Sequence, residues 1–198
     1  MPINILGMIG VAPATNNATV HVIGGGIDPE YLRRFAQEHE RADFDSVLVG
    51  YTSSSAEGFQ IAQFAAAQTE KLKFLVAHRP GFVMPSLAAR TIATCDVLTG
   101  GRIWLHTISG TADAEQQRDG DWLGHDQRYA RTREYLQIMR SVWTTDKPFT
   151  FKGEYYSVRH ASSEISSIQK PHVPIYFGGA SDAAVAVGAE HADVYALF

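Results

Sequence analysis

The stretch KFLVAHRPGFVMPSLAARTIATCDVLTGGRIWLHTI, residues 73–108, decides the class of fold. It opens with an apolar run at 73–78, continues through Pro85, which suits the first turn of a helix, and reaches a Gly-Gly pair that suits a helix end. A second apolar run follows at 102–108. A strand, a helix and a strand in this order predict a βαβ unit with parallel strands.

The same alternation continues toward the N-terminus. Candidate strands occupy 3–10 and 45–51, and a loop at 11–27 precedes a helix opened by Asp28 as N-cap and Pro29 at the first helical position. The apolar residues that lie along one face of this helix at 3.6-residue spacing are Tyr31, Leu32, Phe35 and Ala36. Ser53 to Ser55 offer caps to a further helix that runs to about Gln68.

The alternation also continues toward the C-terminus. A polar loop at about 109–126 precedes a long helix for which Asp126 is the expected cap. Residues 149–158 suggest a hairpin that turns at Lys152 and Gly153. A fifth strand at 173–179, a helix at 181–191 and a sixth strand at 193–198 complete the pattern.

Six strands with intervening helices predict an α/β fold with a parallel sheet, which is either an open doubly wound sheet or a (β/α)8 TIM barrel. The count favours an incomplete barrel with about six of its eight strands. Residues 1–198 are then a single domain whose C-terminal part is missing, because the chain ends inside an apolar strand.

The composition is that of an ordinary globular chain, with 45% hydrophobic and 19% charged residues. The net charge of −4 gives no reason to expect a nucleic-acid or membrane surface. The single cysteine, Cys95, excludes an internal disulfide and suggests a reducing, cytoplasmic location. No second His or Cys stands at a metal-ligand spacing from His106, so no metal is expected.

Polar residues follow several strands, at the edge where parallel α/β folds bind ligands. Arg79 follows the third strand, and it either pairs with a carboxylate or binds an anion such as a sulfonate, carboxylate or phosphate. His106 in the fourth strand is either a core histidine or a donor to a bound ring. Ser53 to Ser55 follow the second strand, where N-capping and ligand binding are both open.

The segment FGGASD at 177–182 joins the fifth strand to its helix. Gly178 and Gly179 allow close backbone approach, and the helix N-terminus with Ser181 offers N–H and hydroxyl donors to a phosphate. A plain glycine-rich turn is the alternative. Tyr129, at the start of the preceding long helix, adds a phenolic hydroxyl to the same anion.

Four segments together resemble the bacterial luciferase-like flavin monooxygenases, and most closely the alkanesulfonate monooxygenases: residues 72–110, 124–143, 151–158 and 169–195. The family fold is a (β/α)8 barrel of which this chain would cover a little over half. The resemblance implies reduced FMN, supplied by a separate NAD(P)H-dependent flavin reductase, and O2. In the sulfonate branch, C–S cleavage gives an aldehyde and sulfite.

The resemblance also implies roles for individual residues. The FMN phosphate would be held by Tyr129, Gly179, Ala180 and Ser181, and Arg79 would contact an anionic substrate. His106 stands where relatives commonly carry an asparagine facing the flavin ring. Ser55 replaces a cysteine near the flavin, and Ala12 replaces a histidine after the first strand, which weakens the sulfonate assignment.

The sequence therefore predicts an FMN-dependent monooxygenase acting on an alkanesulfonate or related organosulfur compound, in a homodimer or homotetramer. Three alternatives stay open. The first is an oxidoreductase of the same fold with another substrate, which the residues at positions 12 and 55 favour. The second is a shortened, non-catalytic flavin-binding barrel. The third, an open-sheet nucleotide-binding protein, lacks a glycine fingerprint after the first strand.

Overall fold

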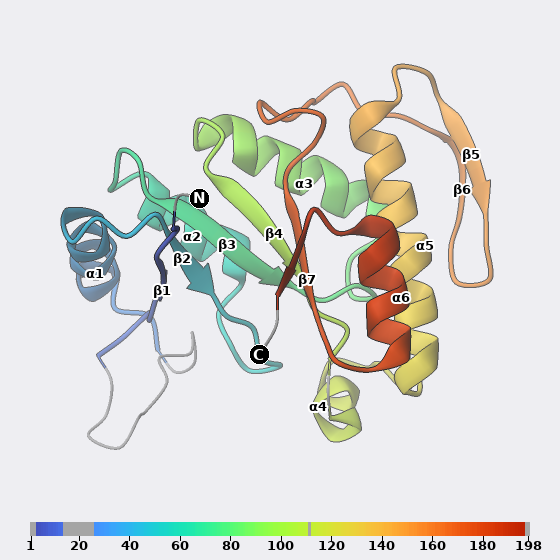
Figure 1. The fold of residues 1–198 in the computed structure, drawn as a ribbon, viewed down its shortest axis with the longest axis horizontal. Coiled ribbons are helices and arrows are strands. Elements are labelled where there is room, and N and C mark those ends of the chain that lie inside the picture. The colour runs from blue at the N-terminus through green and yellow to red at the C-terminus, as the bar shows by residue number, and fades with distance from the viewer. Residues whose placement is uncertain (1–2, 14–25, 111, 197–198) are drawn as a thin grey trace.

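The computed structural model describes residues 3–13, 26–110 and 112–196. Its six-stranded sheet contains β1 (Leu6–Met8), β2 (Ser46–Val49), β3 (Lys73–His78), β4 (Ile103–Thr107), β7 (Ile175–Gly178) and β8 (Val194–Ala196). The helices are α1 (Pro29–Arg41), α2 (Gly58–Ala66), α3 (Pro85–Leu98), α4 (Asp113–Arg118), α5 (His125–Thr144) and α6 (Asp182–His191). The strands β5 (Phe149–Lys152) and β6 (Ser157–Ala161) form a separate antiparallel hairpin (Figure 1).

The order of the strands decides between the two predicted architectures. The sheet runs β1-β2-β3-β4-β7-β8, and every neighbouring pair is parallel. Strands that follow one another in chain order across the sheet are typical of a barrel, whereas a doubly wound sheet reverses direction at a switch point. The curled sheet forms a half-barrel, which confirms the predicted incomplete (β/α)8 fold.

Local sequence signals set the first helix as predicted. Asp28 caps α1, because its side-chain oxygen accepts hydrogen bonds from the N–H groups of Glu30 and Tyr31, each at 3.0 Å. Leu32 and Ala36 are buried in the hydrophobic core, and Tyr31 contacts the ring of Phe35. Most of the predicted loop at 11–27 lies outside the described residues.

Two predicted helix starts are wrong. The helix α2 is capped by Glu57, whose carboxylate accepts from the N–H of Gln60 at 2.9 Å, and not by Ser53 to Ser55. The helix α5 begins at His125 and not after Asp126. Its N-cap is Gly124, whose N–H donates to the side-chain oxygen of Gln127 at 3.0 Å.

Two connections differ from their predictions. The predicted loop at 109–126 contains the short helix α4. The hairpin does not turn at Lys152 and Gly153, because Lys152 pairs with Ser157 and residues 153–156 form the turn. The carboxylate of Glu134 holds this longer turn by accepting from the N–H groups of three successive residues: Glu154, Tyr155 and Tyr156. The first strand is also shorter than predicted, at Leu6–Met8.

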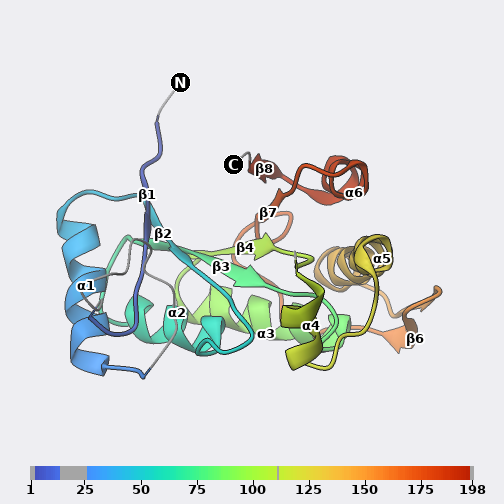
Figure 2. The ribbon, with the colours of Figure 1, turned by 90° about the horizontal axis from the view of Figure 1, so that it is seen from below.

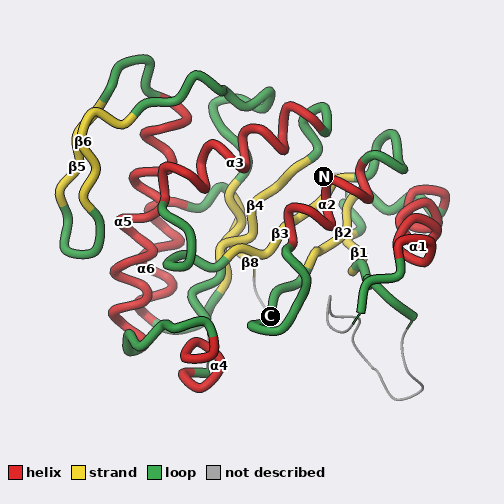
Figure 3. The backbone as a smooth tube through the Cα atoms, turned by 180° about the vertical axis from the view of Figure 1, so that it is seen from behind, coloured by secondary structure: helices red, strands yellow, loops and turns green. Residues whose placement is uncertain are grey.

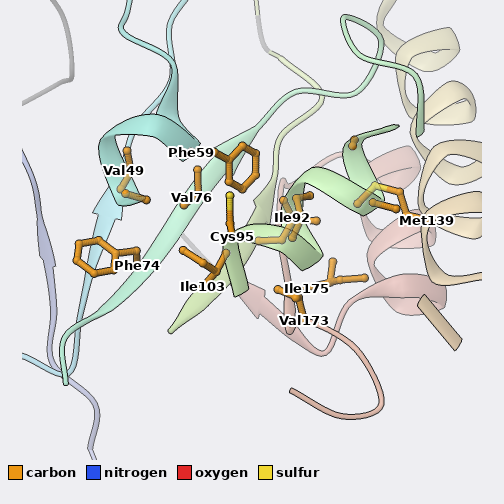
Figure 4. Close-up of a cluster of buried hydrophobic side chains, with 14 of the residues drawn as sticks. Val49, Phe59, Phe74, Val76, Ile92, Cys95, Ile103, Met139, Val173 and Ile175 are labelled. Carbon is orange, nitrogen blue, oxygen red and sulfur yellow. The ribbon is translucent and has the colours of Figure 1, made fainter. Parts of the chain in front are cut away.

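The hydrophobic core lies between the sheet and its helices. Alternate residues of the central strands face the helices: Phe74 and Val76 in β3, Ile103 and Leu105 in β4, and Ile175 and Phe177 in β7. Figure 4 shows several of these side chains against Ile92 and Cys95 of α3. Burying so much apolar surface on this side stabilises the packing of α2 and α3 on the sheet.

The intervening residues point to the concave face of the sheet. Leu75 pairs with Trp104, and Ala77 pairs with His106, which in turn pairs with Tyr176. Figure 2 shows α2 and α3 below β3 and β4, and α6 higher up, beside β7 and β8. Seen from behind, α3 crosses the sheet, and α5 and α6 lie side by side at its β7 end (Figure 3). His106 is thereby aimed at the hollow of the half-barrel.

Candidate functional site

A cleft of about 270 Å³ opens at the carboxyl ends of the parallel strands. Residues from the ends of β2, β3, β4 and β7 line it together with α4 and α5: Tyr51, Arg79, His106, Ile108, Ser109, Gly110, Glu115, Tyr129, Gly178 and Gly179. Because the barrel brings every strand exit to the same edge, five residues named from the sequence meet in one place: Arg79, His106, Tyr129, Gly178 and Gly179.

The connection between β7 and α6 has the geometry of an anion cradle. Gly179 has a φ of +147°, and a Cβ placed on it would lie 2.6 Å from the Cβ of Ala184 and 3.2 Å from the hydroxyl of Tyr129. Only glycine fits there. Ser181 caps α6 and accepts from the N–H of Ala184 at 3.2 Å. The first N–H groups of this ten-residue helix lack carbonyl partners within the helix and carry its positive dipole.

Tyr129 completes this cradle from the first turn of α5. Its ring packs on Phe177 and His125, and only 9% of the residue is exposed. Burial raises the pKa of Tyr129, and the hydroxyl of Ser181 acts in the opposite direction as a hydrogen-bond partner. The phenol is therefore a neutral donor at physiological pH. Tyr129, Gly179, Ala180 and Ser181 together offer hydroxyls and backbone N–H groups, which are the donors that suit a phosphate ester.

His106 contributes an imidazole to the floor of the same cleft. It is 6% exposed, and burial lowers its pKa below the ordinary histidine value. The ring is therefore uncharged at neutral pH. An uncharged imidazole can donate from one ring nitrogen and accept at the other.

Arg79 stands at the exit of β3 with its side chain 2% exposed. Its Nη2 donates to Glu115 at 2.9 Å, and its Nη1 lies 3.5 Å from Asp119. The guanidinium also lies over the ring of Tyr51, at 4.5 Å from the centroid. Of the two predicted readings, the carboxylate pairing is thus present in the structure. Binding of an anionic substrate by Arg79 stays a prediction.

Two more arginines fasten the segment that carries α4. Arg128 donates to Asp113 at 2.8 Å and to the carbonyl of Leu123 at 2.6 Å. Arg131 donates to both carboxylate oxygens of Asp121, at 3.0 and 2.6 Å, and to the carbonyl of Pro80 at 2.9 Å. These contacts hold residues 112–124 against the strand exits, so that Glu115 reaches the cleft.

Ser55 does not line the cleft. Its hydroxyl donates to the carbonyl of Thr52 at 2.8 Å and accepts from the N–H of Thr52 at 3.0 Å, which closes a turn. A flavin-facing role for Ser55 stays a prediction. The sequence reasoning missed Tyr51, Glu115 and Asp119, although a run of acidic residues at 113–121 was a signal that arginines elsewhere would need partners.

A second cavity of about 690 Å³ lies between α2 and α3. Its lining is mainly apolar, with Phe59, Phe82 and Leu87, and it shares Tyr51 and Arg79 with the cleft. Arg79 and Tyr51 therefore form the wall between the two hollows.

Two searches of the described part of the chain bear on the class of protein. Within residues 3–13, 26–110 and 112–196, His, Cys, Asp and Glu side chains form no group of three or more that could hold a metal ion. No helix in these ranges combines the length and the apolar character that a bilayer crossing requires.

Comparison with known proteins gives a family and a fold. The family model described as luciferase-like monooxygenase matches residues 6–198. Among solved structures, EDTA monooxygenase from Chelativorans sp. BNC1 is 18% identical, with a TM-score of 0.80, over 98% of this chain and 53% of that one. An F420-dependent secondary alcohol dehydrogenase in complex with an F420-acetone adduct is 24% identical, with a TM-score of 0.79, over 98% and 58%.

A third similar structure contains FMN. It is the oxygenating constituent of 3,6-diketocamphane monooxygenase from Pseudomonas putida, which is 18% identical, with a TM-score of 0.71, over 94% of this chain and 55% of that one. The chain thus spans little more than half the length of these structures. At such identities the likeness establishes the shared fold.

Proposed function

Because this chain belongs to the luciferase-like monooxygenase family, we propose that it is the flavin-binding part of an FMN-dependent monooxygenase. The observation that carries the proposal is the cradle formed by Tyr129, Gly179 and Ser181 at the N-terminus of α6. Its donors are neutral hydroxyls and backbone N–H groups, which suit the FMN phosphate. Gly179 leaves the space that a side chain would fill.

In this proposal the chain's own groups hold and orient the cofactor. Tyr129, Ser181 and the backbone at Gly179 and Ala180 hold the phosphate, and the uncharged imidazole of His106 hydrogen-bonds the ring system. When bound, reduced FMN would supply the electrons for a reaction with O2. The protein binds the ring, fixes the substrate beside it and excludes water.

The proposed enzyme belongs to a two-component system. A separate NAD(P)H-dependent reductase delivers reduced FMN, and the substrate is an alkanesulfonate or related organosulfur compound. A sulfonate would be cleaved at its C–S bond to an aldehyde and sulfite. Assembly as a homodimer or homotetramer is part of the same proposal.

A second candidate is a flavin oxidoreductase of this fold with a different substrate. One observation favours it. Glu115 and Asp119 lie beside Arg79, so the guanidinium that would bind a sulfonate already forms ion pairs with two carboxylates of the same chain. Release of sulfite from a panel of sulfonates, compared with oxidation of sulfones, amines and alkanes under the same conditions, separates the two candidates.

Phosphate recognition tests the flavin proposal without requiring turnover. Titration with FMN and with riboflavin, followed by flavin fluorescence, should give tighter binding of FMN. Tyr129→Phe and Ser181→Ala should each reduce the preference for FMN about tenfold, since each removes one hydrogen bond to a charged group. Tyr31→Phe, the same chemical change on α1, is the matched control and should leave the preference unaltered. Equal binding of the two flavins by the wild-type protein would refute the proposal.

A further inference from the structure

The backbone of the cradle has a hydrogen-bond partner in the last strand of the sheet. The hydroxyl of Tyr195, in β8, donates to the carbonyl oxygen of Gly179 at 2.7 Å. Tyr195 pairs with Phe177 in the register of β7 and β8, and the two rings pack with their centroids 6.3 Å apart. The strand that follows α6 in the chain thus reaches back to the turn that precedes α6.

A glycine within α6 makes room for the ring of Tyr195. A Cβ placed on Gly188 would overlap the Cε2 atom of Tyr195 and would lie 2.6 Å from its Cδ2 atom. Glycine is an unfavourable residue inside a helix, because it loses more conformational freedom than alanine does. The space that the Tyr195 ring needs explains why a glycine stands at this position of α6.

The hydrogen bond from Tyr195 fixes the direction of one peptide group. The peptide bond between Gly179 and Ala180 is trans, so the carbonyl of Gly179 and the N–H of Ala180 point in opposite directions. Because Tyr195 holds the carbonyl, the N–H of Ala180 is directed away from the Tyr195 hydroxyl. Glycine tolerates many backbone angles, so without this hydrogen bond the peptide group would be free to turn over and to exchange the places of its N–H and its carbonyl.

The N–H of Ala180 belongs to a set of free donors at the start of α6. No described residue accepts a hydrogen bond from the N–H groups of Ala180, Ser181, Asp182 or Ala183. N–H groups at a helix N-terminus attract a phosphate, whereas a carbonyl oxygen turned toward the phosphate would repel it. The direction of the peptide between Gly179 and Ala180 therefore decides whether this part of the cradle attracts or repels an anion.

We propose that Tyr195 is a positioning residue for the FMN phosphate: it holds the peptide group of Gly179 so that the N–H of Ala180 is presented to the anion. The inference rests on the proposed function, because it requires that the cradle binds FMN. A tyrosine hydroxyl has one hydrogen, and here the carbonyl of Gly179 receives it. Tyr195 therefore acts through the backbone, unlike Tyr129 and Ser181, whose hydroxyls the proposed function assigns to the phosphate itself.

Tyr195→Phe tests the inference, because it removes the hydroxyl and keeps a ring beside Phe177. Titrations followed by flavin fluorescence should show FMN binding about tenfold weaker than in the wild type and riboflavin binding changed less than about twofold. Riboflavin has no phosphate, so the ratio of the two affinities isolates phosphate recognition from binding of the ring system. Tyr31→Phe on α1 is the matched control and should keep the wild-type ratio.

Amide NMR gives a second readout, which the wild-type protein supplies by itself. FMN, unlike riboflavin, should move the amide proton of Ala180 downfield, because that N–H then donates to a charged acceptor. In Tyr195→Phe the same shift should be smaller.

The outcomes separate the inference from the proposed function. If the wild type prefers FMN and Tyr195→Phe keeps that preference, or weakens both flavins equally with a lower Tm, Tyr195 is only a structural contact and the inference fails while the proposed function stands. An Ala180 amide that does not respond to FMN in the wild type overturns the inference even where the variant does not fold. Equal binding of FMN and riboflavin by the wild type refutes the proposed function and the inference with it.

Discussion

Gly179→Ala is the substitution that most directly disturbs the cradle. The backbone there has a φ of +147°, which costs a residue with a Cβ about 1–3 kcal/mol. The new Cβ would also meet the Cβ of Ala184 at 2.6 Å and the hydroxyl of Tyr129 at 3.2 Å. The Cβ of Ala184 cannot rotate away, so the helix α6 must shift, at about 1–3 kcal/mol more. The sum, about 2–6 kcal/mol, corresponds to a fall in Tm of about 4–24 °C.

Two assays measure this prediction. Thermal unfolding followed by circular dichroism gives the loss of stability, and titration with FMN and riboflavin gives the loss of phosphate recognition. Gly100→Ala is the matched control, because Gly100 has a φ of +67° but nothing lies within 4 Å of its added Cβ. It should lose only about 1 kcal/mol, from the left-handed backbone, and should keep its preference for FMN.

Equal falls in Tm for Gly179→Ala and Gly100→Ala would refute the steric reasoning. An unchanged ratio of FMN to riboflavin affinity in Gly179→Ala would refute the assignment of the cradle to the phosphate, whatever the stability of the variant.

Three further predictions concern buried polar groups. Asp96→Ala should lower the free energy of unfolding in urea by about 3 kcal/mol, because the fully buried carboxylate of Asp96 accepts from the N–H groups of Ile168 and Gln169. The control Asp126→Ala, at an exposed carboxylate, should cost under about 1 kcal/mol. Similar losses in the two variants would contradict the role of Asp96. His78, whose pKa burial lowers to about 4, takes up its proton first in the unfolded chain, so stability should fall by up to about 3 kcal/mol between about pH 6.5 and 4. His78→Gln should flatten that part of the pH profile of unfolding, and an unchanged slope would contradict the assignment. Tyr51→Phe should leave the Arg79 ion pairs intact and cost about 1 kcal/mol in urea unfolding, because only the hydrogen bond to Asp119 is lost.

Features set by neighbouring residues could be predicted from the sequence. Asp28 and Pro29 place the start of α1, and the apolar runs at 73–78 and 102–108 place β3 and β4. Gly179, directly after β7, marks the cradle, since glycine is required where φ is positive and atoms approach closely. These signals lie within a few residues of the structure they specify.

The partners of Arg79 could not be predicted in the same way. Glu115 and Asp119 are distant in sequence, and they reach Arg79 because α4 folds over the strand exits. The sequence predicts a loop in place of α4, because the polar composition of this helix gives no apolar face to detect. The start of α5 was misplaced by two residues, since Gly124 caps it with help from the side chain of Gln127 and without a side chain of its own.

The central claim is that a flavin phosphate binds at the N-terminus of α6. A crystal structure of the protein with FMN tests it most directly. We expect the phosphate oxygens to lie within hydrogen-bond distance of the Ser181 hydroxyl, the Tyr129 hydroxyl and the first amides of α6. A phosphate bound elsewhere, with the cradle between Gly179 and Tyr129 left to water, would contradict the account.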